Sequence, residues 1–400
     1  MERYVVKNQK HLRCGITTGS CAAAAADAAA SFLLLGIRKE NVSLLTPKNL
    51  IIEVPVSYVD GSVESGGKYE ALGYCDERAC FMTVKDSGDD PDVTDKSEIY
   101  VTIQRINDEL FDERWFVSEE YTNLYLDGGI GVGRVTKPGL EQNIGQAAIN
   151  AVPRKMIFGA VGAVCRQAEY EGRLLITVSI PNGVELAGKT FNPRLGICGG
   201  ISVLGTSGII EPMSEQSIVA TIEAEIKQRV GQGEDKLIIA PGNYGQEYIE
   251  KYLAIDMNKS IKCSNYIGDT LDLAVSYGIR DILLVGDIGK LVKLAAGIMN
   301  THSRVADARM EILAIHTVLS GGSKETAEKI MQCINTEQVL DELALCGLRD
   351  RVISGICDKI YDYVRHRVGD RVSIGVILFS KKYGYLGETQ GSSKLVELFK

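Results

Sequence analysis

The chain has 400 residues, more than one hydrophobic core usually serves, so we expect two domains. Hydrophobic residues make up 45% and charged residues 24% of it, which is the composition of a globular protein rather than of a disordered or fibrous one. The formal net charge of −8, without any long run of Lys or Arg, argues against a nucleic-acid partner.

The first predicted element is an alanine-rich helix over residues 21–35. Basic residues precede it, and a basic segment followed by a short apolar run resembles an export signal. Asp27 interrupts the run, however, and its roughly 15 residues are fewer than the ~20 that span a bilayer. We therefore expect a core helix that packs closely through its alanines and ends at Gly36, and neither a signal peptide nor a membrane span.

The residues that follow alternate strands, turns and loops with few helices. Strands are predicted over 42–45, 51–58, 79–85, 99–104, 122–126 and 174–180. A helix is expected over 143–149, and a second runs from Glu215, with Ser214 as its N-cap, to about Val230. This mixture predicts an N-terminal α+β domain over residues 1–232.

Two loops of this domain carry weak functional signals. Gly128 to Gly133 contains the spacing GxGxG, which does not match the dinucleotide fingerprint GxGxxG. Residues 86–95 contain five aspartates that could bind a cation, although a solvated loop is the commoner fate of such a run. The ten cysteines include no CxxC pair and only four histidines are present. We therefore expect reduced thiols in a cytoplasm, and no metal site built by the protein.

A linker is predicted at 231–235, and beyond it strands and helices alternate regularly. Strands are predicted over 236–240, 261–264, 281–285 and 311–318, with one helix running through Ala274 and another starting after Gly289. Helices over 325–333, 336–345 and 349–365 precede a last strand over 372–379. Strands alternating with helices over short connections predict a Rossmann-like, doubly wound parallel sheet over residues 233–400.

Three loops of the second domain, 242–245, 264–265 and 286–290, fall at predicted carboxyl ends of strands. Such sheets bind ligands beyond these ends, at a topological switch point, and glycines there let the backbone approach the ligand. We therefore predict a nucleotide-like cofactor at this edge, with Asp287 as a partner of ribose hydroxyls. The predicted cofactor-binding residues are Gly242, Asn243, Gly245, Ser264, Asn265, Gly286, Asp287 and Gly289. The polar turn 300–303 ends the same stretch with more polar groups than packing alone requires.

The residues alone leave three classes of function open. The first is a transferase that uses a nucleotide-like cofactor, binds a bulky substrate in a cleft between the domains and catalyses by positioning. The second is a small-molecule kinase, because Gly15 to Ser20 resembles a phosphate cradle before a helix. The loop GxxxxGK[ST] is absent, so this reading is the weaker one. The third is a non-catalytic binding or carrier protein.

A series of segments resembles one known family, the cobalt-precorrin-5B C1-methyltransferases of anaerobic cobalamin (vitamin B12) biosynthesis. The segments are LRCGITTGSCAAAA (12–25), GVGRVTKPGL (131–140), VPRKMI (152–157), FNPRLGI (191–197), GGIS (199–202), GIIEPMS (208–214) and residues 289–303. Each is short, but the ordered series covers nearly the whole chain and is specific. Asp287 stands where the family usually has His, and Ala151 where it usually has Pro. The missing histidine makes position 287 a weak candidate for essential chemistry.

The resemblance implies methylation of C-1 of cobalt-precorrin-5B to give cobalt-precorrin-6A, with S-adenosylmethionine as methyl donor and cobalt carried by the substrate. The corrinoid bears several acetate and propionate groups, for which Arg and Lys are fitting partners. The predicted substrate-binding residues are Arg134, Lys137, Arg154, Lys155, Arg194, Lys290 and His302. The resemblance transfers no catalytic residues, and a homo-oligomer is compatible with the sequence. A corrinoid carrier is the alternative function, with the kinase less favoured.

Overall fold

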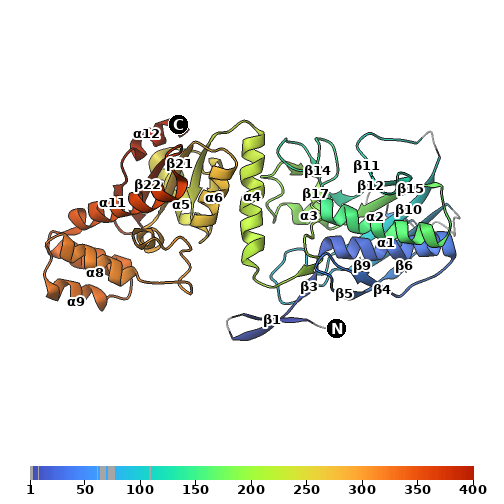
Figure 1. Cartoon of the computed structure of the whole chain (residues 1–400), viewed down its shortest axis with the longest axis horizontal. Helices are drawn as coiled ribbons and strands as arrows, with labels where there is room; N and C mark the ends of the chain where they lie inside the picture. The colour runs from blue at the N-terminus through green and yellow to red at the C-terminus, as the bar shows by residue number, and fades with distance from the viewer. Residues whose placement is uncertain (1–2, 8, 61, 64–68, 71–76, 108–109) are drawn as a thin grey trace. The chain divides into compact units, whose positions relative to one another are not determined.

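The computed structural model describes residues 3–7, 9–60, 62–63, 69–70, 77–107 and 110–400 (Figure 1). Contacts within the chain divide it into two compact units, residues 1–215 and 216–400. Both contain helices and β-sheet, with parallel and antiparallel strand pairs, so the fold is mixed α/β. Each unit has its own large hydrophobic core.

The first unit contains a six-stranded sheet in the order β11-β12-β15-β10-β9-β6. Its strands are β6 (Ser57–Val59), β9 (Arg78–Val84), β10 (Glu98–Ile106), β11 (Phe116–Val117), β12 (Leu124–Gly128) and β15 (Arg173–Ser179). β12 and β15 run parallel, and the other neighbouring pairs are antiparallel. The predicted strands 79–85, 99–104, 122–126 and 174–180 are confirmed with small shifts of their ends, whereas 51–58 is split into β5 (Ile51–Pro55) and β6.

Helices α1 (Thr18–Leu35) and α2 (Ala151–Gln167) pack against each other and against this sheet (Figure 1). The alanines of α1 are fully buried, and their small side chains let neighbouring backbone come close. A Cβ added to Gly19 would lie only 2.8 Å from Cγ of Pro153 in α2. The expected core helix is confirmed, including its end at Gly36, which has φ 69°. Among the described helices α1 alone is long and apolar enough to cross a membrane, and 72% of that stretch is buried within the protein.

The helix predicted over 143–149 is wrong. These residues form turns and isolated β-bridges, and the helix starts later, at Ala151. Ala147 and Ile149 are buried through bridges to the segments around Arg134 and Val203 instead of through a helical face. Pro153 falls in the first turn of α2, where its missing N–H has no helical partner to lose.

The other elements of the first unit are short. They are β1 (Tyr4–Lys7), β2 (Lys10–Arg13), β3 (Gly15–Ile16), β4 (Asn41–Leu45), β7 (Ser62–Val63), β8 (Tyr69–Glu70), β13 (Gly131–Val132), β14 (Arg134–Val135), α3 (Gly183–Ala187), β16 (Ile197–Cys198), β17 (Gly200–Ile201) and β18 (Ile209–Ile210). Three small two-stranded ladders, β13 with β17, β14 with β16 and β3 with β18, order the glycine-rich loops of this unit.

The second unit contains a five-stranded sheet in the order β20-β19-β21-β22-β23. Its strands are β19 (Lys236–Ala240), β20 (Ser260–Lys262), β21 (Asp281–Asp287), β22 (Ser373–Ser380) and β23 (Gly384–Glu388). The first four strands are parallel, and β23 is antiparallel to β22. The chain moves from β19 outward to β20 and then crosses to β21 on the other side of β19. The direction of winding therefore reverses between β19 and β21, which makes this position the topological switch point.

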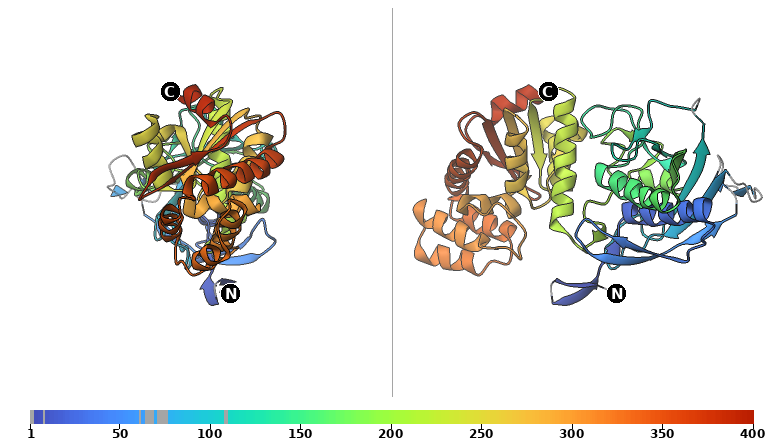
Figure 2. Two further views of the ribbon diagram at one scale, coloured as in Figure 1. Left: turned by 90° about the vertical axis from the view of Figure 1, so that its left-hand side faces the viewer. Right: turned by 45° about the vertical axis from the view of Figure 1, so that its right-hand side comes forward.

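Helices cover both faces of this sheet (Figure 2). α5 (Asn243–Leu253) and α12 (Ser392–Phe399) pack on the face that carries Leu283. α4 (Glu215–Gly231), α6 (Ile267–Ser276) and α11 (Arg349–Val368) pack in the core that contains Leu284, on the opposite face. Ile222 and Ile226 of α4 belong to that core. The division between the units falls at the start of α4, between residues 215 and 216, whereas the predicted domain boundary is 232/233.

Residues 311–318 form helix α8 (Arg309–Leu319) and not the predicted strand. The spacing of their apolar residues fits both the period of a strand and that of a helix. Leu313 and Thr317, four residues apart, are both buried, as expected for one face of a helix. α8, α9 (Lys324–Met331) and α10 (Thr336–Leu345) lie between β21 and β22 in the chain, so β22 is the fourth parallel strand. The predicted bounds 236–240 and 336–345 are confirmed.

Candidate functional site

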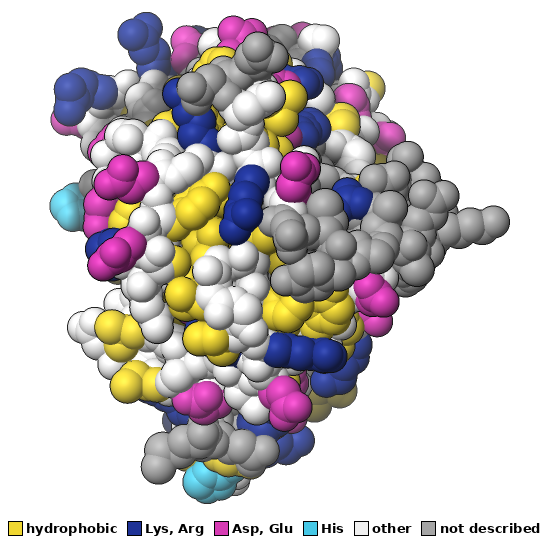
Figure 3. All heavy atoms as spheres, turned by 90° about the vertical axis from the view of Figure 1, so that its right-hand side faces the viewer, with side chains coloured by type: hydrophobic (Ala, Val, Ile, Leu, Met, Phe, Trp, Pro, Cys, Tyr) yellow, Lys and Arg dark blue, Asp and Glu magenta, His cyan; other side chains and the backbone are white. Residues whose placement is uncertain are grey.

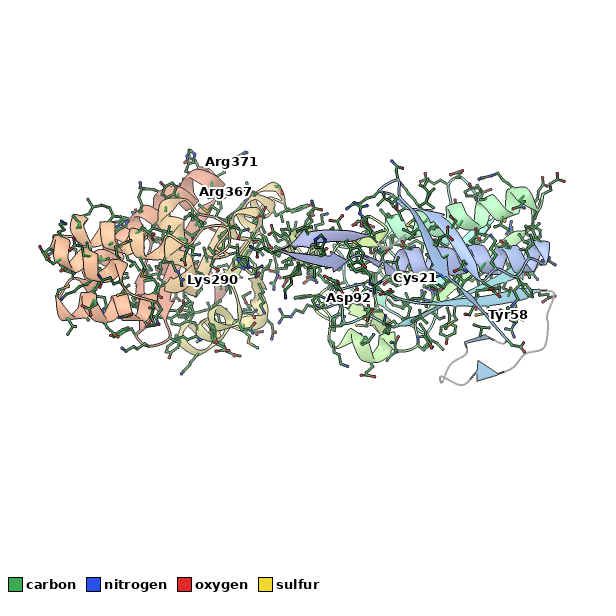
Figure 4. The ribbon with its side chains drawn as sticks, turned by 90° about the horizontal axis from the view of Figure 1, so that it is seen from below. Cys21, Tyr58, Asp92, Lys290, Arg367 and Arg371 are labelled. Atoms are coloured by element: carbon green, nitrogen blue, oxygen red, sulfur yellow. The ribbon has the colours of Figure 1, made fainter. Side chains whose placement is uncertain are left out.

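One side chain, that of Lys290, joins the carboxyl ends of β19, β20 and β21. Lys290 lies in the short helix α7 (Ile288–Leu291), directly after β21 (Figure 4). Its Nζ donates to the carbonyl oxygen of Pro241, after β19, at 2.8 Å, and to that of Ser264, after β20, at 3.4 Å. The three loops singled out from the sequence are thus held together at one edge of the sheet, around the switch point.

Burial changes the titration of groups around Lys290. Loss of solvent lowers the pKa of the Lys290 ammonium, and the charge of Lys262 acts in the same direction. Burial also raises the pKa of the Cys263 thiol to about 12, so this thiol is neutral at pH 7. Because the thiolate is the nucleophilic form, Cys263 is a structural residue and a poor nucleophile.

Asp287 ends β21 and caps α7. Its Oδ1 accepts the Gly289 N–H at 2.8 Å, and a Cβ added to Gly289 would lie 2.8 Å from that same oxygen. Burial raises the pKa of Asp287, and Glu337 adds to the rise, while the Gly289 N–H and the charges of Lys381 and Lys290 oppose it. A carboxylate at a strand end is where nucleotide-binding folds hold ribose hydroxyls, so the position suits the predicted role.

The glycines of this edge have two different functions. Gly242, the N-cap of α5, has φ 129° and ψ 178°, a conformation that favours glycine. A Cβ added there would have one neighbour within 4 Å, Lys290 Nζ at 3.9 Å, which is an ordinary van der Waals contact. A Cβ on Gly245 would instead lie 2.8 Å from a carbonyl oxygen of β21, and one on Gly286 would lie 2.9 Å from the Leu291 side chain. Close packing explains Gly245 and Gly286, whereas the backbone conformation explains Gly242.

The polar turn 300–303 packs on the loop that follows β20. Thr301 donates its N–H to the carbonyl oxygen of Asn265 at 2.9 Å and its hydroxyl to Oδ1 of the same residue at 3.3 Å. His302 accepts a backbone N–H of its own turn on Nδ1 at 3.1 Å. Ser264 adopts a left-handed backbone with φ 54°, which residues other than glycine seldom do. These polar groups therefore build the loop through internal hydrogen bonds.

Three further lysines at this edge were missed from the sequence. Lys381 follows β22, and its Nζ lies 3.2 Å from the centre of the Tyr244 ring in the first turn of α5. Lys262, at the end of β20, donates to Oδ1 of Asn243. Lys293 is buried in the 3₁₀ helix η2 (Val292–Ala296) and donates to the carbonyl oxygens of residues 301 and 306 at 3.1 and 2.8 Å. The position of Lys293 in an apolar segment could have indicated a buried lysine from the sequence. The position of Lys381 beside Tyr244 could not have been predicted without the order of the strands in the sheet.

The predicted substrate-binding residues of the first unit fall into two groups. Arg134 forms a bidentate ion pair with Asp127 at 2.6 and 2.8 Å. The Arg154 guanidinium lies 4.3 Å from the centre of the Phe116 ring, and burial lowers its pKa. The other three, Lys137, Lys155 and Arg194, are exposed. The exposed three are the better candidates for a carboxylate partner, because binding a ligand breaks no strong internal contact of theirs.

On the face shown in Figure 3, hydrophobic side chains form a central group with basic and acidic side chains around it. Among the described residues, exposed hydrophobic side chains of the first unit include Leu45, Ile51 and Phe111. Mixed signs of charge around apolar groups are ordinary for a protein surface.

Protein contacts fill the candidate phosphate cradle at residues 15–20. The Gly19 N–H donates to the carbonyl oxygen of Leu204 at 2.9 Å, and the Ser20 N–H donates to Thr17 Oγ1 at 3.2 Å. The Ser20 hydroxyl donates to the carbonyl oxygen of Gly208 at 2.6 Å. A phosphate would have to replace these partners, which weakens the kinase alternative.

The acidic segment 86–95 is also held by hydrogen bonds and ion pairs within the protein, whereas the sequence predicted a solvated loop. Arg13 binds both carboxylate oxygens of Asp86, at 2.6 and 2.7 Å, and holds its pKa well below the usual range. The buried Lys85 donates to Asp92 at 2.5 Å. Among the described residues, no group of three His, Cys, Asp or Glu side chains is placed to hold a metal ion.

Two family descriptions match the sequence, CbiD over residues 5–212 and CbiD, C-terminal domain, over residues 300–390. The chain is 42% identical to a cobalt-precorrin-5B C(1)-methyltransferase of Ruminiclostridium cellulolyticum, over 95% of this chain and 92% of that relative. It is 41% identical to a protein of the same name from Thermoanaerobacter sp., over 97% and 98% of the two chains. Among solved structures it is similar to the cobalamin biosynthesis protein cbiD of Archaeoglobus fulgidus, with 24% identity and a TM-score of 0.38, covering 76% of this chain and 87% of that one.

Proposed function

The chain belongs to the CbiD family, and we propose that it is a cobalt-precorrin-5B C1-methyltransferase that takes its methyl group from S-adenosylmethionine. The observation that supports this reaction is the similarity to relatives of that name, which match this chain over nearly its full length. The substrate is a corrinoid that brings its own cobalt, and the product is cobalt-precorrin-6A.

One observation supports a cofactor site at the edge of the second sheet. Lys290 ties the loops after β19 and β20 to the start of α7, on both sides of the switch point. Gly242 is partly exposed there, next to Lys290 Nζ, and the Asp287 carboxylate stands at the adjacent strand end. The strand order and the helices on both faces support a Rossmann-like cofactor domain. The proposed binding residues are Gly242, Asn243, Ser264, Asn265 and Asp287, with Gly245, Gly286 and Gly289 shaping the loops.

S-adenosylmethionine supplies a methyl group on a positively charged sulfur, already activated for attack by a carbon nucleophile. The task of the protein is therefore to align the two reactants and to exclude water. The Lys290 bridge fixes the separation of two loops, and the Asp287 cap fixes the start of α7. Both contacts preorganise the edge without taking part in a covalent step.

The exposed cations of the first unit are proposed to bind the carboxylates of the corrinoid. Arg194 follows Pro193, and Lys137 precedes Pro138, so proline restricts the backbone beside each charge. A guanidinium offers a planar fork to a carboxylate, which an ammonium does not. Arg194 is therefore expected to contribute more to substrate binding than Lys137. Lys290 and His302 form hydrogen bonds within the protein and are proposed to shape the site. They would contact substrate only through atoms that these hydrogen bonds do not use, such as Nε2 of His302.

Transfer of label separates the enzyme from the corrinoid carrier. Anaerobic incubation with cobalt-precorrin-5B and methyl-labelled S-adenosylmethionine should place one label on the macrocycle. Tight binding of the corrinoid without transfer would favour the carrier, and consumption of ATP would favour the kinase. A Lys290→Met protein in the same assay should transfer label more slowly, with the rate recovering at high cofactor concentration.

A further inference from the structure

The contact between Tyr244 and Lys381 reaches across the carboxyl end of β21. Tyr244 follows β19 and Lys381 follows β22, and β21 lies between these two strands in the sheet. The Lys381 ammonium lies 3.2 Å from the centre of the Tyr244 ring. Burial raises the pKa of Asp287, which ends β21, and the charge of Lys381 opposes that rise. The face of the Tyr244 ring therefore stands over the edge proposed to bind the cofactor.

One face of the Tyr244 ring contacts a cation, the Lys381 ammonium. Tyr244 is 53% exposed, so the hydrophobic core does not account for its position. Lys381 is exposed, and the contact found for its ammonium among the described residues is with the Tyr244 ring; its neighbour Lys382 is the residue that pairs with Asp341. An aromatic face attracts cations through its quadrupole, and onium ligands such as methylated ammonium groups are bound in this way. A flexible lysine that contacts such a face can be replaced there by another cation.

We infer that the face of Tyr244 binds the sulfonium group of S-adenosylmethionine, which replaces the Lys381 ammonium on the ring. This inference rests on the proposed function, because it assumes that this cofactor binds at this edge. In the reaction the donor loses its methyl group and, with it, the positive charge on sulfur. When the methyl group leaves, the electron pair of the broken bond stays on sulfur and S-adenosylhomocysteine is neutral. The contact therefore distinguishes donor from product, and Lys381 competes for the ring more effectively once the charge has gone.

Calorimetric titration of the full chain with S-adenosylmethionine and with S-adenosylhomocysteine tests the inference. The measured quantity is the ratio of the two dissociation constants, because contributions common to both ligands cancel in it. Tyr244→Leu should weaken donor binding roughly 2- to 30-fold, the range of a cation–π contact, and change product binding by less than about twofold. Tyr244→Phe should keep the wild-type ratio. Lys381→Met should shift the ratio further toward the donor, and Lys381→Arg should not.

A matched control is Tyr252→Leu, on the same helix α5 and 57% exposed, which should leave the ratio unchanged. Equal weakening of both ligands by Tyr244→Leu would overturn the inference, because the ring would then contact a neutral part of the ligand. An unchanged ratio in both Tyr244→Leu and Lys381→Met would overturn it as well. A wild-type protein that binds neither ligand would instead remove the proposed cofactor, a different failure that the same titration reveals.

Discussion

The Lys290 ammonium and the Pro241 carbonyl oxygen, 2.8 Å apart, link the first helix after β21 to the end of β19. This hydrogen bond spans the position where the winding of the sheet reverses. Open sheets bind their ligands there because the loops on the two sides diverge and leave a crevice. In this protein a partly buried lysine sets how far the two loops diverge.

Lys290→Met keeps the aliphatic stem of the side chain and removes both hydrogen bonds. We expect the free energy of unfolding of the second unit to fall by about 1–2 kcal/mol, because two carbonyl oxygens lose their donor. Cofactor affinity should fall about tenfold, since the loops are then free to separate. Urea unfolding and calorimetry measure the two effects, with Lys324→Met, at an exposed position of α9, as the control. A destabilised variant with normal cofactor affinity would show that the bridge serves stability alone.

Gly245→Val should lower the melting temperature as well as cofactor binding. The added Cβ would lie 2.8 Å from the Val285 carbonyl oxygen and 3.0 Å from Ala240 Cβ, so α5 must move away from the sheet. Overpacking of this kind costs about 1–3 kcal/mol. Gly159→Ala, in α2 with nothing within 4 Å of the new Cβ, is the contrasting change and should stabilise its helix by about 0.5–1 kcal/mol. Unchanged melting of Gly245→Val would mean that α5 yields without cost.

Arg194→Ala and Arg134→Ala should separate substrate binding from stability. Arg194 is exposed, so its loss should raise KM for the corrinoid, by more than Lys137→Ala does, and leave melting unchanged. An exposed charge contributes about 1 kcal/mol and a desolvated bidentate arginine about 2–5 kcal/mol. Arg134→Ala should instead cost about 1–3 kcal/mol of stability, because Asp127 loses its bidentate partner. Normal KM with impaired cofactor binding in Arg194→Ala would place Arg194 in the other site.

The stability of the second unit should carry a pH-dependent contribution from Asp287. Burial raises the pKa of this carboxyl above its ordinary value of 3.8, so the folded state binds the proton more tightly than the unfolded state. The contribution is complete below the ordinary pKa and is lost as pH rises through the folded-state pKa. Asp287→Asn keeps an oxygen for the Gly289 N–H and cannot ionise. It should therefore gain stability relative to the parent protein as pH rises above the ordinary pKa of 3.8 and through the raised folded-state pKa. Parallel stability curves for the two proteins would contradict this account.

Local sequence patterns were sufficient where one period dominated. The strand 236–240 and the helix 336–345 were predicted with their bounds, because their apolar spacing fits one structure alone. The segments 143–149 and 311–318 were assigned the wrong structure because short apolar runs fit strand and helix alike. The first is buried by bridges to distant segments, which no local pattern reports.

The candidate site divides in the same way. Glycines and Asp287 at strand ends were visible in the sequence because turn chemistry is local. The partners of Lys290 were not, since Pro241 and Ser264 reach it through strand pairing. Tyr244 and Lys381 meet because the strands that precede them, β19 and β22, are the two neighbours of β21. Strand order is a property of the whole sheet and cannot be predicted from a local pattern.

Every alanine of helix α1 is fully buried, and within the alanine run only Asp27 is partly exposed, where it pairs with Lys39. The strands β9 and β10 and the helix α2 all rest on it. A fragment that began after Gly36 would leave the apolar surface that α1 covers open to water, and such surface drives aggregation. A large part of the core of the first unit is therefore built on α1, so truncation from the N-terminal side through this helix should destabilise the unit.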